Sequence, residues 1–246
     1  MSRIVRVFPS SQALADAAVD QIRALAAGAI AARGRFVIAL TGGSTPEKTY
    51  QQLAHRKSDW GRWFVFMGDD RHVPLHDVRS NFGMSQRTLL NNVPIPPAQL
   101  FPPPTAVQPV EACAEEYDRT VRTFFSGGPV IFDLVLLGLG DDGHTASLFP
   151  HAAALKRTAE CVTSSPPGIL PPPVNRVTFT FPVLNSARDV LFLVAGANKA
   201  GTMARVLNPA ANVEDTPAAG IHPVRGTLTF LLDAAAAAQL PAEFLK

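Results

Sequence analysis

Four segments of the sequence place glycine, hydroxyl, carboxylate, histidine or basic side chains directly after a short apolar run. They are "LTGGSTPEKTY" (40–50), "MGDDRHVPLHDVRSNFGMSQRTLL" (67–90), "GLGDDGHTASLFP" (138–150) and "LVAGANKAGTM" (193–203). Open parallel sheets bind ligands beyond the carboxyl ends of their strands, so the loops that leave strands are where chemistry is expected. We therefore expect these four segments to be parts of one site.

The third segment contains a pattern typical of dinucleotide binding. Gly138, Gly140 and Gly143 match G-x-G-x-x-G. However, Asp141 and Asp142 stand where a pyrophosphate would lie, and like charges about 4 Å apart repel by roughly 4 kcal/mol at an effective dielectric constant of 20. The fingerprint also needs an acidic residue at the end of a second strand about 20 positions on. The chain there reads "ECVTSSPPGILPPP", for which no strand is expected, so the sequence disfavours a nucleotide cofactor.

His144 follows the last of these glycines and suits catalysis better. Histidine is the side chain that most often serves as a general base near neutral pH. Asp141 and Asp142 can orient its imidazole or stabilise the protonated form. The alternative is that one aspartate caps the turn "HTASLF" and that His144 has no chemical role.

The first segment has the features of an anion site. Gly42 and Gly43 permit a tight turn, and Ser44 or Thr45 is expected to cap a helix that opens with Pro46. Free backbone N–H groups, hydroxyls and a helix N-terminus together favour phosphate. The spacing of a P-loop is absent. The alternative is an ordinary turn with a good helix cap.

The second segment carries charge without a clear metal-binding pattern. Arg71 offers a fork of donors for a carboxylate or phosphoryl oxygen. Asp69, His72 and His76 are possible metal ligands, but Pro74 between the histidines breaks the helical spacing that would align them. No metal site is therefore predicted, and the alternative for this segment is a set of solvated loop charges.

The fourth segment contributes a lysine in an unusual position. Lys199 is expected in the first turn of a helix, where the helix dipole disfavours a cation. A bound anion would explain it, and a solvated lysine is the alternative. Arg225, in the segment before the last predicted strand, is expected to close the same pocket.

The elements that must position these residues alternate along the chain. Strands are predicted over 4–8, 35–40, 63–67, 132–139, 176–181, 190–195 and 227–232, and helices over 11–32, 46–56, 80–91, 108–125, 198–207 and 233–239. Several strands are almost continuously apolar, as strands covered on both faces are. The alternation predicts an α/β fold with a doubly wound, mostly parallel sheet and helices on both faces. Two proline-rich stretches, 93–105 and 164–175, are expected to be rigid loops of a single domain spanning 1–246.

Composition limits the possible partners and location. The 246 residues are 47% hydrophobic and 17% charged, with a net charge of +2. This charge is too small, and its basic residues too scattered, to indicate nucleic-acid binding. Cys113 and Cys161 suggest no disulfide framework or zinc site. No signal peptide or membrane span is expected, so we predict a cytoplasmic protein that binds no membrane; the sequence does not indicate an oligomeric state.

The four segments, in this order, resemble the glucosamine-6-phosphate isomerase/6-phosphogluconolactonase family, and within it the lactonases. The resemblance covers about residues 36–232. It implies hydrolysis of a phosphorylated lactone, 6-phospho-D-glucono-1,5-lactone, without a metal or cofactor. His144 would be the base that activates water, with Asp142 and Asp69 supporting it. Arg71 would bind the substrate and stabilise the developing oxyanion.

The same resemblance implies the phosphate site. Gly42, Gly43, Ser44 and Lys199 would hold the 6-phosphate. Thr41, also expected at the substrate, stands where serine is common in the family. Asp70 stands where glutamate is usual; both departures preserve the chemical type.

Two other functions compete with lactone hydrolysis. The amino-sugar phosphate deaminases of the family continue their histidine loop with an asparagine–glutamate–proline triplet. This chain has Leu148, Phe149 and Pro150 instead, without the carboxylate. A non-catalytic sugar-phosphate sensor would normally carry an effector module, for which the predicted strands leave no room. The sequence favours the hydrolase.

Overall fold

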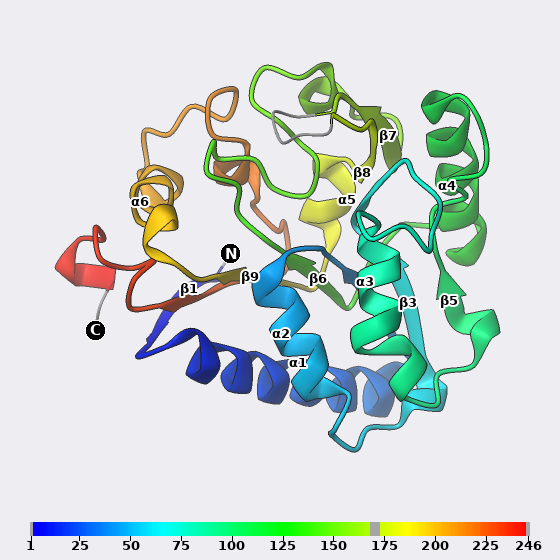
Figure 1. Ribbon diagram of the computed structural model, residues 1–246, viewed down its shortest axis with the longest axis horizontal. Coiled ribbons are helices and arrows are strands. Elements are labelled where there is room, and N and C mark those ends of the chain that lie inside the picture. The colour runs from blue at the N-terminus through cyan, green and yellow to red at the C-terminus, as the bar shows by residue number, and fades with distance from the viewer. Residues whose placement is uncertain (1, 168–172, 245–246) are drawn as a thin grey trace.

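A sheet of seven strands, all parallel to their neighbours, forms the centre of the part of the chain that the structure describes, residues 2–167 and 173–244 of a computed structural model (Figure 1). The strand order is β1-β10-β9-β6-β2-β3-β5. The strands are β1 (Ser2–Phe8), β2 (Phe36–Leu40), β3 (Trp63–Met67), β5 (Leu100–Phe101), β6 (Leu134–Leu137), β9 (Asp189–Val194) and β10 (Thr227–Asp233).

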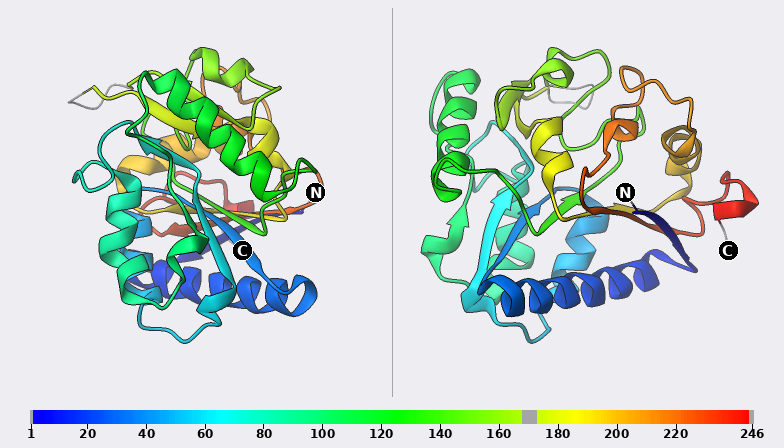
Figure 2. Two further views of the ribbon diagram at one scale, coloured as in Figure 1. Left: turned by 90° about the vertical axis from the view of Figure 1, so that its right-hand side faces the viewer. Right: turned by 180° about the vertical axis from the view of Figure 1, so that it is seen from behind.

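Apolar side chains on both faces of the strands explain why helices cover the sheet on both sides. In β2, Ile38 joins one core and Val37 joins the other, so the strand is buried throughout. The first core is closed by α1 (Ser11–Arg33), α2 (Ser44–Leu53) and α3 (Asn81–Thr88). The second is closed by α4 (Val110–Phe124), α5 (Phe181–Ser186) and α6 (Ala200–Leu207) (Figure 2). The predicted doubly wound α/β fold is confirmed.

A second, smaller sheet lies outside this layer. It is antiparallel and consists of β4 (Asp69–Arg71), β8 (Arg176–Phe179) and β7 (Val162–Ser165). The strand predicted over 176–181 therefore exists, but it does not extend the parallel sheet. The expectation that "ECVTSSPPGILPPP" contains no strand is wrong, because β7 lies within it. Its serine and threonine side chains give no apolar run, and only pairing with β8 makes it a strand.

Several element boundaries also differ from those predicted. Helix α2 begins at Ser44 with Gly43 as its N-cap, so neither Ser44 nor Thr45 caps it. Helix α6 follows a short 3₁₀ turn, Ala197–Lys199. The segment 234–239 forms turns, and no helix. Of the second proline-rich stretch, residues 168–172 lie outside the described residues. None of the helices in the described ranges is long and apolar enough to cross a lipid bilayer.

Two buried tyrosines fix the ends of neighbouring strands. The Tyr50 hydroxyl accepts a hydrogen bond from the backbone N–H of Thr41 at 3.0 Å and donates to the Thr41 carbonyl at 2.9 Å. The Tyr117 hydroxyl likewise accepts from the N–H of Met67 at 2.9 Å and lies 3.1 Å from its carbonyl. Burial raises the pKa of both hydroxyls, so they stay protonated and able to donate. The first residues of two site-bearing loops are thereby held rigidly.

We expect Tyr50→Phe to lower the free energy of unfolding by roughly 2–3 kcal/mol, because it leaves two buried backbone groups of Thr41 without partners. The ring and its packing are retained, so the change reports the hydroxyl alone. Urea unfolding of the two proteins measures the difference. Equal stabilities would show that Tyr50 does not fix the loop.

Candidate active site

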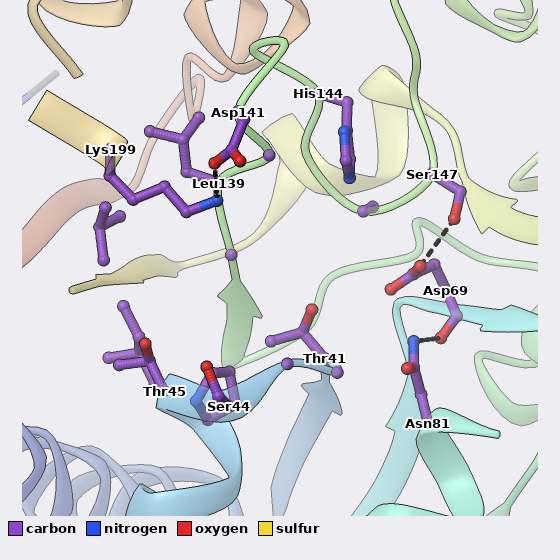
Figure 3. Close-up of a pocket in the computed structure, with 18 of the residues that line it drawn as sticks. Thr41, Ser44, Thr45, Asp69, Asn81, Leu139, Asp141, His144, Ser147 and Lys199 are labelled. Atoms are coloured by element: carbon purple, nitrogen blue, oxygen red, sulfur yellow. Dashed lines mark hydrogen bonds and ion pairs between the residues drawn. The ribbon is translucent and has the colours of Figure 1, made fainter. Parts of the chain in front are cut away.

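The strand order reverses between β2 and β6, and a cavity of about 410 Å³ opens at the carboxyl ends of these strands. From β2 the chain proceeds to β3 and β5, whereas from β6 it proceeds to β9 and β10, so their exit loops diverge. This is the place where open α/β sheets bind ligands. Segments following β2, β6 and β9 surround the cavity together with β4 and the start of β8 (Figure 3).

His144 lies in the loop after β6, with its ring pointing into the cavity (Figure 3). Its Nδ1 donates to Asp142 Oδ1 at 2.6 Å, and its backbone N–H donates to the same oxygen at 3.0 Å. Gly140 permits this arrangement, because a Cβ there would lie 2.1 Å from His144 Nδ1. Nε2 has no hydrogen-bond partner among the described residues. The imidazole is therefore oriented at one nitrogen and open at the other.

The surroundings of the pair favour an ionised Asp142. Burial alone would raise the pKa of this carboxyl, but the hydrogen bond and charge of His144 outweigh it and hold the pKa below its ordinary value of 3.8. The ring of Phe149 also packs against the imidazole, with ring centroids 4.6 Å apart. The histidine thus contacts both a carboxylate and an aromatic ring.

The glycine loop after β2 forms the opposite wall. Thr41, Gly42, Gly43 and Ser44 all line the cavity. A Cβ on Gly42 would lie 1.9 Å from the Asn81 side-chain oxygen, and Gly43 has a φ of +112°, which favours glycine. The loop leads directly into the N-terminus of α2, where unpaired N–H groups and the helix dipole attract anions.

Two arginines lie side by side in the small sheet. Arg71 of β4 pairs with Arg176 of β8 in the antiparallel register, and both line the cavity. Arg71 Nη1 donates to the Arg79 carbonyl at 2.6 Å, which fixes one edge of its guanidinium. Within residues 2–167 and 173–244, the buried Nε atoms of both arginines have no hydrogen-bond partner. Burial, with the charge of Arg71 adding to it, lowers the pKa of Arg176. These uncompensated donors are suited to an anionic ligand.

Asp69 lies in the cavity but bonds to a residue other than the histidine. Its Oδ2 accepts a hydrogen bond from Ser147 Oγ at 2.7 Å, and its backbone carbonyl accepts from Asn81 Nδ2 at 3.1 Å (Figure 3). Among the described residues Asp69 makes no hydrogen bond to His144. Of the two carboxylates expected to support His144, Asp142 is the one that contacts it.

Asp70, the next residue of β4, is fully buried, and its carboxylate holds backbone groups in place. Its carboxylate accepts hydrogen bonds from the backbone N–H groups of Arg71, Asn81 and Phe82 and from the Ser80 hydroxyl. Burial raises its pKa to about 6, against the opposing effect of these N–H donors. Asp70 thus ties β4 to the N-terminus of α3 and keeps Arg71 and Asn81 at the cavity.

The two basic residues expected to close the pocket have different positions. Lys199 lines the cavity and pairs with Asp141 at 2.5 Å. The prediction for Arg225 is wrong, since it is exposed and does not line the cavity. It precedes β10, at the amino edge of the sheet, and the length of the strand, about 20 Å, separates that edge from the carboxyl edge.

The polar cavity residues that the sequence analysis did not predict include Arg176, Ser147 and Asn81. Arg176 is the first residue of a predicted strand. If that strand belonged to the parallel sheet, Arg176 would lie at the amino edge, away from the cavity. Ser147 lies in the segment 138–150 and Asn81 in the segment 67–90, but nothing in their spacing identifies them as site residues. Within the described residues, no group of three histidine, cysteine, aspartate or glutamate side chains is arranged to hold a metal ion.

The fold and the cavity define an α/β protein with a small-molecule site where its strand order reverses. The chain belongs to the glucosamine-6-phosphate isomerase/6-phosphogluconolactonase family, whose model matches residues 9–230. It is 41% identical to a 6-phosphogluconolactonase from Nostoc sp. over 98% of this chain and 99% of that protein. The corresponding human 6-phosphogluconolactonase is 37% identical, over 99% of this chain and 96% of the human one.

Solved structures agree with this assignment. The 6-phosphogluconolactonase from Trypanosoma brucei superposes with a TM-score of 0.87 at 32% identity, covering 98% of this chain and 99% of that one. A monomeric glucosamine-6-phosphate deaminase gives a TM-score of 0.79 at 23% identity, covering 97% and 100%, which shows a shared fold alone.

We expect Asp142→Asn to make stability less sensitive to acid. Because the folded pKa of Asp142 lies below its ordinary value, its contribution is present above about pH 5 and is lost as pH falls through the folded pKa. Urea unfolding of both proteins between pH 3 and 7 should show the wild type losing more stability toward pH 3. Parallel pH profiles would contradict a stabilising bond between Asp142 and His144.

Proposed function

We propose that this protein hydrolyses 6-phospho-D-glucono-1,5-lactone to 6-phospho-D-gluconate, as a single domain spanning 1–246 and without a metal or cofactor. The observation that carries the proposal is the His144–Asp142 pair, whose Nε2 is unbonded in the described part of the chain, in a cavity that also contains a phosphate-type loop. The names of the relatives supply the substrate, and the cavity supplies a base and several anion donors for it.

The reaction begins with a water molecule between His144 and the lactone carbonyl carbon. Nε2 takes a proton from this water while the water oxygen bonds to the carbonyl carbon. The products of this step are a tetrahedral oxyanion and an imidazolium. The carbonyl then re-forms, the bond to the ring oxygen breaks, and Nε2 returns the proton to that oxygen. Asp142 accepts from Nδ1 throughout, which fixes the tautomer and stabilises the imidazolium.

Arginine side chains are suited to the charge that develops on the carbonyl oxygen. We assign Arg71 to substrate binding and oxyanion stabilisation, because its unpaired Nε and its position on the cavity wall leave donors for a ligand. Arg176 adds a second guanidinium beside it. Asp69, held by Ser147, lines the same cavity as both arginines, and we assign it to orienting the substrate rather than to supporting His144.

The phosphate is assigned to the opposite end of the cavity. Gly42, Gly43 and Ser44 expose backbone at the N-terminus of α2, with Thr41 beside them, and Lys199 supplies a cation from the loop after β9. A phosphate there would compensate the helix dipole and the ammonium group together. With the phosphate bound there, the lactone carbonyl of the substrate would lie toward His144.

The neighbourhood of His144 favours hydrolysis over deamination. The position where the deaminases of this family carry glutamate is occupied by Phe149, which packs on the imidazole. Isomerisation of an amino-sugar phosphate needs a base directed at carbon, whereas lactone hydrolysis needs activated water and an oxyanion partner. A sugar-phosphate sensor would need the phosphate donors but not an oriented histidine.

We further infer a cytoplasmic protein that acts on a small molecule and does not bind nucleic acid. Cys113 and Cys161 are both buried free thiols, as is usual in reducing compartments. The net charge of +2 gives little attraction for a polyanion.

We expect His144→Ala to lower kcat for lactone hydrolysis by about 10²–10⁴-fold, because the water loses its base. The assay follows lactone loss above its spontaneous rate, beside ammonia release from glucosamine 6-phosphate. His151→Ala, at an exposed histidine outside the cavity, is the matched control and should retain activity. Near-normal turnover by His144→Ala would remove it from the base role. Ammonia release without lactone turnover in the wild type would identify a deaminase, and absence of both activities would favour the sensor.

For Lys199→Ala we expect mainly a raised KM, by roughly 10-fold or more, because a charge-assisted contact to the phosphate is lost. Steady-state kinetics with the lactone separates KM from kcat. The matched control is Lys156→Ala, an exposed lysine outside the cavity. An unchanged KM for Lys199→Ala contradicts the phosphate assignment.

A further inference from the structure

Lys199, the cation assigned to the phosphate, already has an anionic partner within the protein. Its Nζ donates to Asp141 Oδ1 at 2.5 Å (Figure 3). Asn198 Nδ2 donates to the same oxygen at 2.9 Å. Asn198, Lys199 and Asp141 all line the cavity. One oxygen of Asp141 therefore accepts hydrogen bonds from both Asn198 and Lys199, at the end of the cavity to which the substrate's phosphate is assigned.

The backbone of Asp141 is held independently of this contact. Its carbonyl accepts from Thr202 Oγ1 at 2.8 Å and from Arg205 Nη2 at 3.3 Å, both on α6. The Asp141 side chain, in contrast, is 67% exposed. The carboxylate can therefore rotate into solvent while the loop that carries His144 stays attached to α6.

The charges involved favour such a displacement. An exposed ion pair between single charges stabilises weakly, because water competes with it. A phosphate monoester carries nearly two negative charges and three acceptor oxygens, and so attracts the ammonium group more strongly than one carboxylate does. Asp141 and a bound phosphate would also repel each other while both stayed near Lys199.

We propose that Asp141 is an internal competitor for the phosphate: its carboxylate holds Lys199 in the empty site and is displaced when the substrate binds. This proposal rests on the proposed function only in placing an anionic group of the ligand at Lys199. Asp141 thereby lowers the affinity for every ligand with this phosphate, the hydrolysis product included. The weaker binding that Asp141 causes also lets the product dissociate faster.

The direct test measures binding of inorganic phosphate by calorimetry to the wild type and to Asp141→Asn, without turnover. We expect Asp141→Asn to bind phosphate about two- to five-fold more tightly, the range given by losing an exposed ion pair. Asp215→Asn is the matched control. It removes the same charge from an exposed aspartate outside the cavity, paired there with His151, and should bind phosphate as the wild type does.

Equal or weaker phosphate binding by Asp141→Asn would overturn the proposal, because Asp141 would then be holding Lys199 in place for the ligand. A second comparison tests the route through Lys199. In a Lys199→Met background the added Asp141→Asn should give no gain in phosphate affinity, and a retained gain would show a general effect of charge and contradict the proposal.

Kinetics with the lactone separates this inference from the proposed function. Asp141→Asn should lower KM by a similar factor and leave kcat unchanged or reduced. A wild-type protein without lactonase activity would refute the proposed function, while the phosphate measurements would still decide the role of Asp141.

Discussion

The parallel direction of all seven main strands is the constraint on which the site depends. Because the strands are parallel, every loop that leaves a carboxyl end emerges at the same edge of the sheet. The reversal of strand order between β2 and β6 then separates two of these loops and leaves the cavity between them. Residues a hundred positions apart, such as Ser44 and His144, face each other for this reason, and no local feature of either loop is sufficient to bring them together.

Buried polar groups convert this convergence into a defined geometry. The Asp70 carboxylate accepts four hydrogen bonds and ties β4 to α3, which places Arg71 on one wall of the cavity. Tyr50 and Tyr117 bond both backbone groups at the ends of β2 and β3. Leaving any of these groups unpaired would cost about 1–3 kcal/mol. The loops are therefore fixed at their origins, and their tips can carry unpaired donors for a ligand.

The strand exits were predictable from the sequence because an apolar run followed by glycine and polar residues marks the end of a buried strand. That rule located the loops of Ser44, Arg71, His144 and Lys199. It failed for Arg176, because β8 runs antiparallel in the small sheet and presents its first residue to the cavity. The prediction for Arg225 was wrong for the opposite reason. Arg225 precedes a parallel strand and therefore lies at the amino edge of the sheet, away from the cavity. Strand direction is set by pairing between distant segments, which local patterns do not reveal.

The loop after β6 shows how neighbouring residues of one type diverge in function. Asp141 and Asp142 carry the same charge and are adjacent in sequence, yet one accepts from Lys199 and the other from His144. Gly140 and Gly143 allow the sharp turn that points the two carboxylates apart. Each aspartate has its own partner, so the two carboxylates that would repel a pyrophosphate lie apart and make separate contacts. The same loop consequently links the proposed base, through Asp142, to the proposed phosphate site, through Asp141.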